Sequence, residues 1–244
     1  MTHMGDYSLF LFLALLAEII GTVSGFGSSI LFVPIASIFL DFKLVLGITA
    51  VFHVFSNLAK IYFFHEGIDK KIVIKLGIPA VIFVTIGALL TNFIPQKSIE
   101  LAMNVLILAL AIYLISGHAR SLQKTNANLY IGGTVSGFLA GLIGTGGAVR
   151  GIVLTAFGLE KNVFIATSAI IDLGVDSSRA AVYIANGYFT KEHLILIPFL
   201  ILISIAGSYL GKLVLRYIPE KAFHYVVLSV IGLTSLLQTI KYFW

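Results

Sequence analysis

Six ionisable side chains lie inside long apolar segments, where a charged group has few solvent partners: Glu18, Lys60, Arg150, Asp172, Asp176 and Arg179. If such a segment crosses a bilayer, an ionisable group near its centre costs at least about 2.5 kcal/mol and needs a partner or a water-filled cavity. Asp172, Asp176 and Arg179 are spaced i, i+4, i+7 and share one helix face. A shift of 119 residues maps this triplet onto another that also ends in a cation: His53, Asn57 and Lys60. We predict that the two triplets meet in the interior.

The two triplets have functional and purely structural interpretations. Arg179 and Lys60 are predicted to contact a substrate, and Asp172, Asp176 and His53 are candidates for proton coupling, since histidine titrates near neutral pH. In the structural alternative, Arg179 is neutralised by Asp176 or by Asp172 and merely holds helices together. Lys60 alternatively extends toward the lipid headgroups, and His53 forms an interhelical hydrogen bond.

Two clusters of small residues supply a second feature, GFGSS at 25–29 and GTGGA at 144–148. Because glycine costs about 1 kcal/mol in a helix interior, each cluster predicts a helix break. The helix that begins after each break points free N–H groups and a partial positive charge at it, which favours anion binding. With Arg150 nearby, cations and helix ends outweigh a few carboxylates. The predicted anion-contact residues are Gly25, Phe26, Gly27, Ser28, Ser29, Asn57, Lys60, Gly144, Thr145, Gly146, Gly147, Arg150 and Arg179.

Close packing of helices is the alternative explanation for small residues in a membrane protein. We favour packing for Gly21 and Gly133, which lie in the repeated string GTVSGF. Consecutive glycines are not needed for packing, so we favour a cavity for 25–29 and 144–147.

The composition places these features in a membrane. Hydrophobic residues make up 59% of 244 residues, charged residues only 11%, and the mean hydropathy is +1.03. Soluble domains carry about 25% charged residues, so this chain has too few to cover a surface in water. The net charge of +5 arises mainly from loop cations, and no cysteine is present for a disulfide or a thiolate site. The start of the chain lacks the cationic region of a secretory signal, and we interpret it as the first membrane segment.

An internal duplication organises the chain. Under the 119-residue shift the two glycine clusters align and Pro79 pairs with Pro198; with a gap of a few residues, Pro95 also pairs with Pro219. We predict an all-α polytopic membrane protein in one transmembrane domain, with repeat 1 at 1–117, a linker at 118–128 and repeat 2 at 129–244. Each repeat is predicted to be a glycine-broken helical hairpin followed by three transmembrane helices. The predicted segments are 7–40, 43–64, 71–93 and 97–117, then 129–158, 161–184, 191–216 and 221–243.

Loop cations predict that the two repeats are inverted. If each broken segment returns to its starting side, nine loop cations lie on one face and four on the other. If each broken segment crosses once, the division is seven against six. Since cytoplasmic loops are enriched in Lys and Arg, the inverted arrangement is favoured, with both termini outside. Inverted repeats with broken helices are frequent in secondary transporters.

The second half resembles a known family. The sequence GFLAGLIGTGG, followed by ATSAIIDLGVDSSRAAVYIANG, is similar to the glycine-rich signature and next helix of the TauE/SafE sulfite exporters, also called toluene-sulfonate uptake permeases. The resemblance covers nearly the whole chain. It implies transport of sulfite, thiosulfate or sulfonates such as sulfoacetate. The first half departs from the usual run of glycines, having GFGSS.

We therefore expect a secondary carrier of a small sulfur-containing anion in the cell membrane, acting by alternating access. The alternatives are a passive anion channel and a membrane subunit that requires a partner. No HExxH, GxSxG or nucleotide-binding motif is present, so an enzyme is not expected. We expect no cofactor, no metal and no nucleic acid; the expected partners are the anion, the lipid bilayer and, as an open alternative, further copies of the chain.

Overall fold

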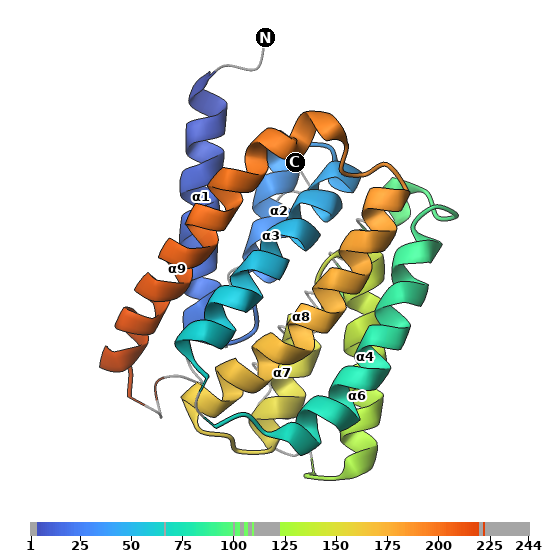
Figure 1. Ribbon diagram of the computed structural model, residues 1–244. Helices are drawn as coiled ribbons and strands as arrows, with labels where there is room; N and C mark the ends of the chain where they lie inside the picture. The colour runs from blue at the N-terminus through green and yellow to red at the C-terminus, as the bar shows by residue number, and fades with distance from the viewer. Residues whose placement is uncertain are drawn as a thin grey trace.

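The computed structural model describes residues 4–65, 67–99, 101–102, 105–106, 109, 123–219 and 222, and contains no strand among them. Among the elements of the described residues, η2 is a 3-10 helix and the others are α-helices (Figure 1). Their bounds are α1 Met4–Ser24, α2 Ser29–Phe39, α3 Phe42–Phe63, α4 Lys70–Leu90, α6 Asn126–Ile143, α7 Gly147–Ala156, α8 Lys161–Ala185, η2 Lys191–Leu196 and α9 Ile197–Tyr217. The all-helical prediction is confirmed over this part of the chain. Most of the predicted segments 97–117 and 221–243 lies outside it.

Three stretches in the described residues are long and apolar enough to cross a bilayer: Phe42–Phe63, Lys70–Leu90 and Lys191–Tyr217. The last begins as a 3-10 helix, where one continuous helix was predicted. Pro198 explains the change, because it lacks an N–H and its ring clashes with the carbonyl four residues earlier in an α-helix. Helix α6 starts at Asn126, earlier than the predicted 129, since the Thr125 hydroxyl accepts a hydrogen bond from the Asn128 N–H.

Both glycine clusters break their segments as predicted. Between α1 and α2, Gly25 and Gly27 have φ of 72° and 84°, and between α6 and α7, Gly144 has φ of 80°. This left-handed backbone suits glycine and reverses the chain. The rings of Phe10 and Phe32 lie 5.6 Å apart, so α2 folds back on α1. Each break therefore forms a hairpin.

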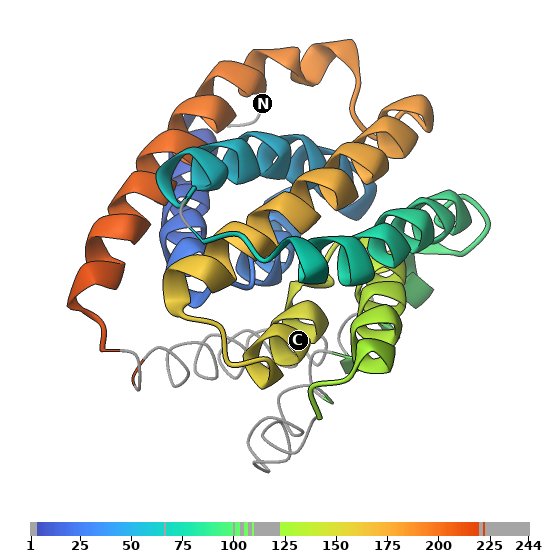
Figure 2. The same ribbon diagram turned by 60° about the horizontal axis from the view of Figure 1, so that its bottom comes forward.

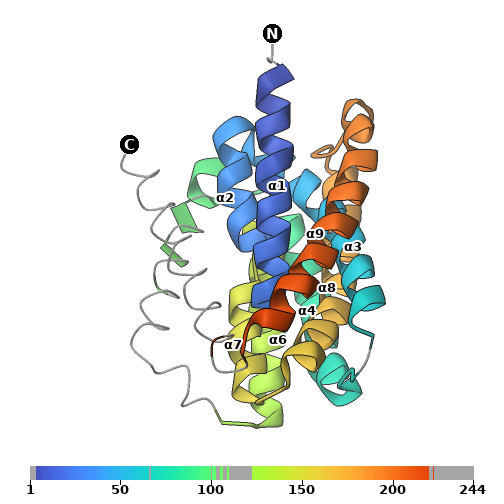
Figure 3. The same ribbon diagram turned by 90° about the vertical axis from the view of Figure 1, so that its left-hand side faces the viewer.

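The two hairpins enter the bundle from opposite ends (Figures 1 and 3). The α1–α2 hairpin opens toward the end of the bundle where the N-terminus lies, and the α6–α7 hairpin opens toward the other end. This arrangement is the one assumed in the inverted model. The symmetry of the two halves, and which end faces the cytoplasm, remain predictions.

Helix α8 runs between α3 and α4 and contacts both of them (Figure 2). Helix α9 packs against α1 and α3, while α6 packs along α4. The α4–α6 contact is very close: a Cβ added at Gly133, Gly137 or Gly141 would lie 2.1–2.2 Å from a backbone oxygen of α4. A Cβ at Gly21 would likewise meet the Ser28 backbone at 2.4 Å. The packing role expected for Gly133 is confirmed, while Gly21 packs against the first break and also lines a small cavity beside it.

Site-directed labelling tests the predicted topology. The single-cysteine variants are Lys71→Cys, Lys124→Cys and Lys191→Cys. The first two positions lie at one end of the bundle, next to the starts of α4 and α6, and Lys191 lies at the other end, at the start of η2. Because the chain has no cysteine of its own, each variant carries one reactive thiol. With a membrane-impermeant maleimide on intact cells, we expect labelling of Lys191→Cys and protection of the other two until the membrane is opened. Labelling of all three on one side would contradict the inverted topology.

Candidate functional site

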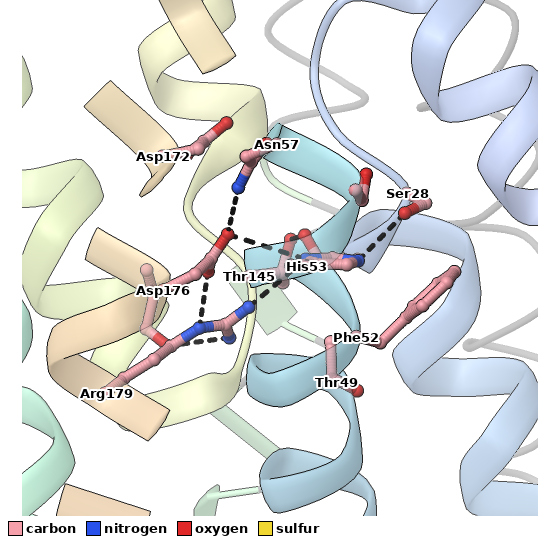
Figure 4. Close-up of polar contacts among 12 residues, drawn as sticks. Ser28, Thr49, Phe52, His53, Asn57, Thr145, Asp172, Asp176 and Arg179 are labelled. Atoms are coloured by element: carbon pink, nitrogen blue, oxygen red, sulfur yellow. Dashed lines mark hydrogen bonds and ion pairs between the residues drawn. The ribbon is translucent and has the colours of Figure 1, made fainter. Parts of the chain in front are cut away.

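The two polar triplets meet where α3 crosses α8, as predicted (Figure 4). The Asn57 amide donates to Asp176 Oδ2 at 2.7 Å, and Arg179 Nη2 lies 3.3 Å from His53 Nδ1. All four side chains are buried. Segments more than a hundred residues apart thus form one polar centre inside an apolar bundle.

Arg179 is only 1% exposed, and its guanidinium forms hydrogen bonds to several buried acceptors. Its Nε donates to Asp176 Oδ1 at 2.7 Å, which confirms the Asp176 pairing alternative. Its Nη1 donates to the carbonyl oxygen of Gly144 at 2.7 Å. Gly144 is the C-cap of α6, so the guanidinium satisfies one of the backbone acceptors that a helix end leaves free. Arg179 therefore joins α8 to the second helix break.

Arg150 pairs with Asp172 through both guanidinium Nη atoms. Its Nε also donates to Ser168 Oγ at 3.0 Å, and the Ser168 hydroxyl donates to the Gly25 carbonyl at 3.2 Å. The alternative pairing of Asp172 with Arg179 is wrong. Arg150 instead ties α7 and α8 to the first helix break.

Lys60 is buried and does not reach the headgroups, so the snorkelling alternative is wrong. Its ammonium lies 2.9 Å from Glu18 Oε1 and donates to Ser56 Oγ at 2.7 Å. Glu18 is fully buried and also accepts hydrogen bonds from four hydroxyls, those of Thr22, Ser28, Ser56 and Ser208. The sequence places Glu18 in an apolar segment but gives no signal for its partner.

The buried charges balance. Among the described residues, three carboxylates pair with three cations: Glu18 with Lys60, Asp172 with Arg150 and Asp176 with Arg179. The side-chain cations alone therefore do not outnumber the carboxylates, and the two helix ends are the remaining positive contribution that the sequence predicted. An anion can bind these cations only by competing with carboxylates that already hold them.

The two helix breaks touch each other. Ser29 Oγ lies 3.4 Å from Thr145 Oγ1, which joins the start of α2 to the second break. Phe26 is 1% exposed and lies against α7, where a Cβ added at Gly151 would fall 1.6 Å from its ring. Ser28 points away from this contact, toward Glu18 and His53.

A small cavity lies where the breaks and triplets converge. Of the predicted contact residues, ten line it: Phe26, Gly27, Ser29, Asn57, Lys60, Gly144, Gly146, Gly147, Arg150 and Arg179. The three proton-coupling candidates His53, Asp172 and Asp176 line it too, as do Ala140 and Val175, which the sequence did not indicate. Gly25 lines an adjoining small cavity, and Ser28 and Thr145 line neither. Only about 10 Å³ is open to the centre of a water molecule, the space of about one water. The site is closed.

A larger cavity of about 490 Å³ lies at the end of the bundle where α3 and α9 finish. Three cations line it: Arg216, which is exposed, and two lysines whose ammonium groups donate to backbone carbonyls, Lys212 to Phe63 at 2.5 Å and Lys161 to Ile218 at 2.9 Å. Cations at helix C-termini are stabilising without any ligand. We assign no site to this cavity.

Comparison with known proteins identifies the family. The profile of the sulfite exporter TauE/SafE family matches residues 10–237. The chain belongs to the TauE/SafE family. It is also 26% identical, over 251 aligned residues and 93% of both chains, to a protein of Methanocaldococcus jannaschii described as a probable membrane transporter. No solved structure matches the chain. The family resemblance expected from the second half is confirmed, and this TauE/SafE protein is a membrane transporter.

Proposed function

We propose that this protein is a secondary carrier of a small sulfur oxyanion or organosulfonate, and that the anion binds where the two helix breaks meet. One observation carries the proposal. Two buried arginines, Arg150 and Arg179, line one cavity together with residues of both breaks. Arginine binds the planar edge of an oxyanion through two parallel N–H donors, and helix N-termini add further donors.

In this proposal the anion exchanges with carboxylates. It displaces the Asp172 carboxylate from the guanidinium of Arg150 and the Asp176 carboxylate from the guanidinium of Arg179. The Ser29 hydroxyl and the first N–H groups of α2 and α7 surround the remaining oxygens. Sulfite, thiosulfate and sulfonates share this demand for several converging donors.

The closed cavity supports alternating access. A site with room for about one water must open before an anion enters. Hairpins that enter from opposite ends and touch at their tips give each side of the membrane its own gate, and hairpin motion relative to α3 and α8 opens one gate at a time. Broken helices around a central site are the usual construction of such carriers.

Flux measurements test the proposal. In proteoliposomes, the purified protein is expected to give saturable uptake and counterflow of at least one of sulfite, thiosulfate and sulfoacetate. Arg150→Gln is expected to reduce the initial rate at least ~10-fold, because loss of one charged hydrogen-bond partner costs about 1.5–3 kcal/mol. Lys191→Gln, which removes an exposed cation at the end of the bundle, is the matched control and is expected to leave the rate unchanged.

The channel alternative predicts a different result. Non-saturating flux with large single-channel currents and no counterflow would show a channel. Unchanged flux in folded Arg150→Gln protein would remove this residue from the anion site.

A further inference from the structure

We infer that His53 carries a proton together with the anion, and that Glu18, acting through Ser28, orients the His53 ring so that its unprotonated nitrogen Nδ1 faces the anion site. The inference rests on the proposed function, because it concerns how anion binding at that site is compensated. Glu18 and Ser28 are positioning residues in this scheme, and His53 Nδ1 is the atom that gains the proton.

The hydrogen-bond chain fixes the tautomer from the Glu18 end. A carboxylate only accepts hydrogen bonds, and Glu18 pairs with the Lys60 ammonium and accepts from the hydroxyls of Thr22, Ser56 and Ser208. Ser28 Oγ lies 2.6 Å from Glu18 Oε2, so the Ser28 hydroxyl must donate to it. Ser28 Oγ also lies 2.8 Å from His53 Nε2 and, with its hydrogen already used, accepts from that nitrogen. His53 therefore carries its hydrogen on Nε2.

The other end of the ring gives the same answer independently. Arg179 Nη2 lies 3.3 Å from His53 Nδ1 (Figure 4). A guanidinium is a donor only, so Nδ1 must be the acceptor and bears no hydrogen. The basic nitrogen Nδ1 of His53 therefore accepts a hydrogen bond from Arg179 in the closed site. It becomes free to take up a proton when the Arg179 guanidinium binds the proposed anion instead.

Charge balance explains why a proton accompanies the anion. The cluster holds three carboxylates and three cations, so an anion adds uncompensated negative charge in the membrane interior. Such a charge is costly unless it is neutralised. One proton on Nδ1 offsets one negative charge. The proton comes from the aqueous phase on the loading side and leaves to the other side with the anion.

The surroundings of His53 suit the protonated ring once Arg179 has moved. Asp176 Oδ2 lies 3.9 Å from Nδ1 and becomes its acceptor, while Nε2–H remains bonded to Ser28. The charged groups that face the ring are Arg179 and Asp176 from α8, Arg150 from α7, Lys60 from α3 and, through Ser28, Glu18 from α1. In the closed site the cations are already matched one for one. An anion held by Arg179 reverses the local balance and favours the imidazolium.

The test compares pH-driven accumulation with anion exchange in proteoliposomes. The probe is thiosulfate, or sulfoacetate if that is the anion transported, since neither takes up a proton near neutral pH. An acidic exterior is expected to drive several-fold accumulation by the wild-type protein, with matching alkalinisation of the external medium. His53→Gln is expected to abolish this pH-driven gain. Exchange of internal for external anion needs no net proton movement, so it is expected to slow but to remain measurable and independent of the pH gradient.

Ser28 variants separate positioning from folding. Ser28→Ala removes the link to Glu18 and is expected to lower the proton-to-anion ratio while exchange persists; Ser28→Thr keeps the hydroxyl and is expected to restore the ratio. His65→Gln, at an exposed histidine, is the control and is expected to behave as wild type.

The possible failures are distinguishable. Absence of any saturable anion flux in the wild-type protein would overturn the proposed function. Two results would overturn the inference alone. One is wild-type flux that does not depend on the pH gradient. The other is full proton coupling in His53→Gln together with loss of proton coupling in Asp172→Asn.

Discussion

Replacing Arg179 by glutamine is expected to lower the initial rate of anion transport about 100-fold, because a charged hydrogen-bond partner is lost, and to destabilise the protein. The substitution leaves the Asp176 carboxylate buried without its guanidinium and the Gly144 carbonyl without its donor. Removing one partner of a buried ion pair costs about 3–5 kcal/mol. Thermal unfolding in detergent and thiosulfate, sulfite or sulfoacetate flux in proteoliposomes measure the two effects.

A double variant distinguishes the two roles of Arg179. Arg179→Gln combined with Asp176→Asn removes both charges, and the amide oxygen that replaces the carboxylate at position 176 still accepts from Asn57, so most of the lost stability is expected to return. The transport rate is expected to stay as low as in Arg179→Gln, because the anion has lost the guanidinium of Arg179. Arg216→Gln, an exposed arginine at the bundle end, is the control. Wild-type flux from the double variant would show that Arg179 is structural only.

Replacing Gly137 by alanine is expected to separate α4 from α6 and lower the free energy of unfolding by about 1–3 kcal/mol, as overpacking does. An added Cβ would lie 2.2 Å from the Ala80 carbonyl oxygen and 2.6 Å from its Cα. Backbone atoms of a packed helix cannot rotate away as a side chain can. Small residues at such positions allow the backbone contact that holds membrane helices together.

Thermal unfolding of the purified protein in detergent measures this effect. Ala127→Val adds bulk to the same helix at an exposed position and is expected to leave the midpoint within a degree or two of wild type. A Gly137→Ala midpoint equal to that of the control would show that the α4–α6 contact tolerates separation.

Local features explain what could be predicted from the sequence. The helix breaks follow from glycines at positions that require a left-handed backbone, such as Gly144. The face shared by Asp172, Asp176 and Arg179 follows from helical periodicity alone. Membrane insertion follows from the scarcity of charge. None of these inferences depends on how distant helices pack.

Ion-pair partners could not be predicted in this way. Asp172 and Asp176 both lie on the face of Arg179, and only the position of α7 decides that Asp172 pairs with Arg150. Glu18 and Lys60 lie on different helices, and their contact depends on where the fold places α1 relative to α3. The balance of charge in the site therefore depends on the packing of all the helices that carry these residues.

The sequence by itself determined that this TauE/SafE protein is a helical membrane protein with two broken segments and two polar triplets, because composition and periodicity act within a single helix. The tertiary structure alone decided that the breaks touch, that Lys60, Arg150 and Arg179 each already have a carboxylate and that the cavity is closed. Those properties depend on distances between helices far apart in the chain, which residue spacing along one helix does not specify.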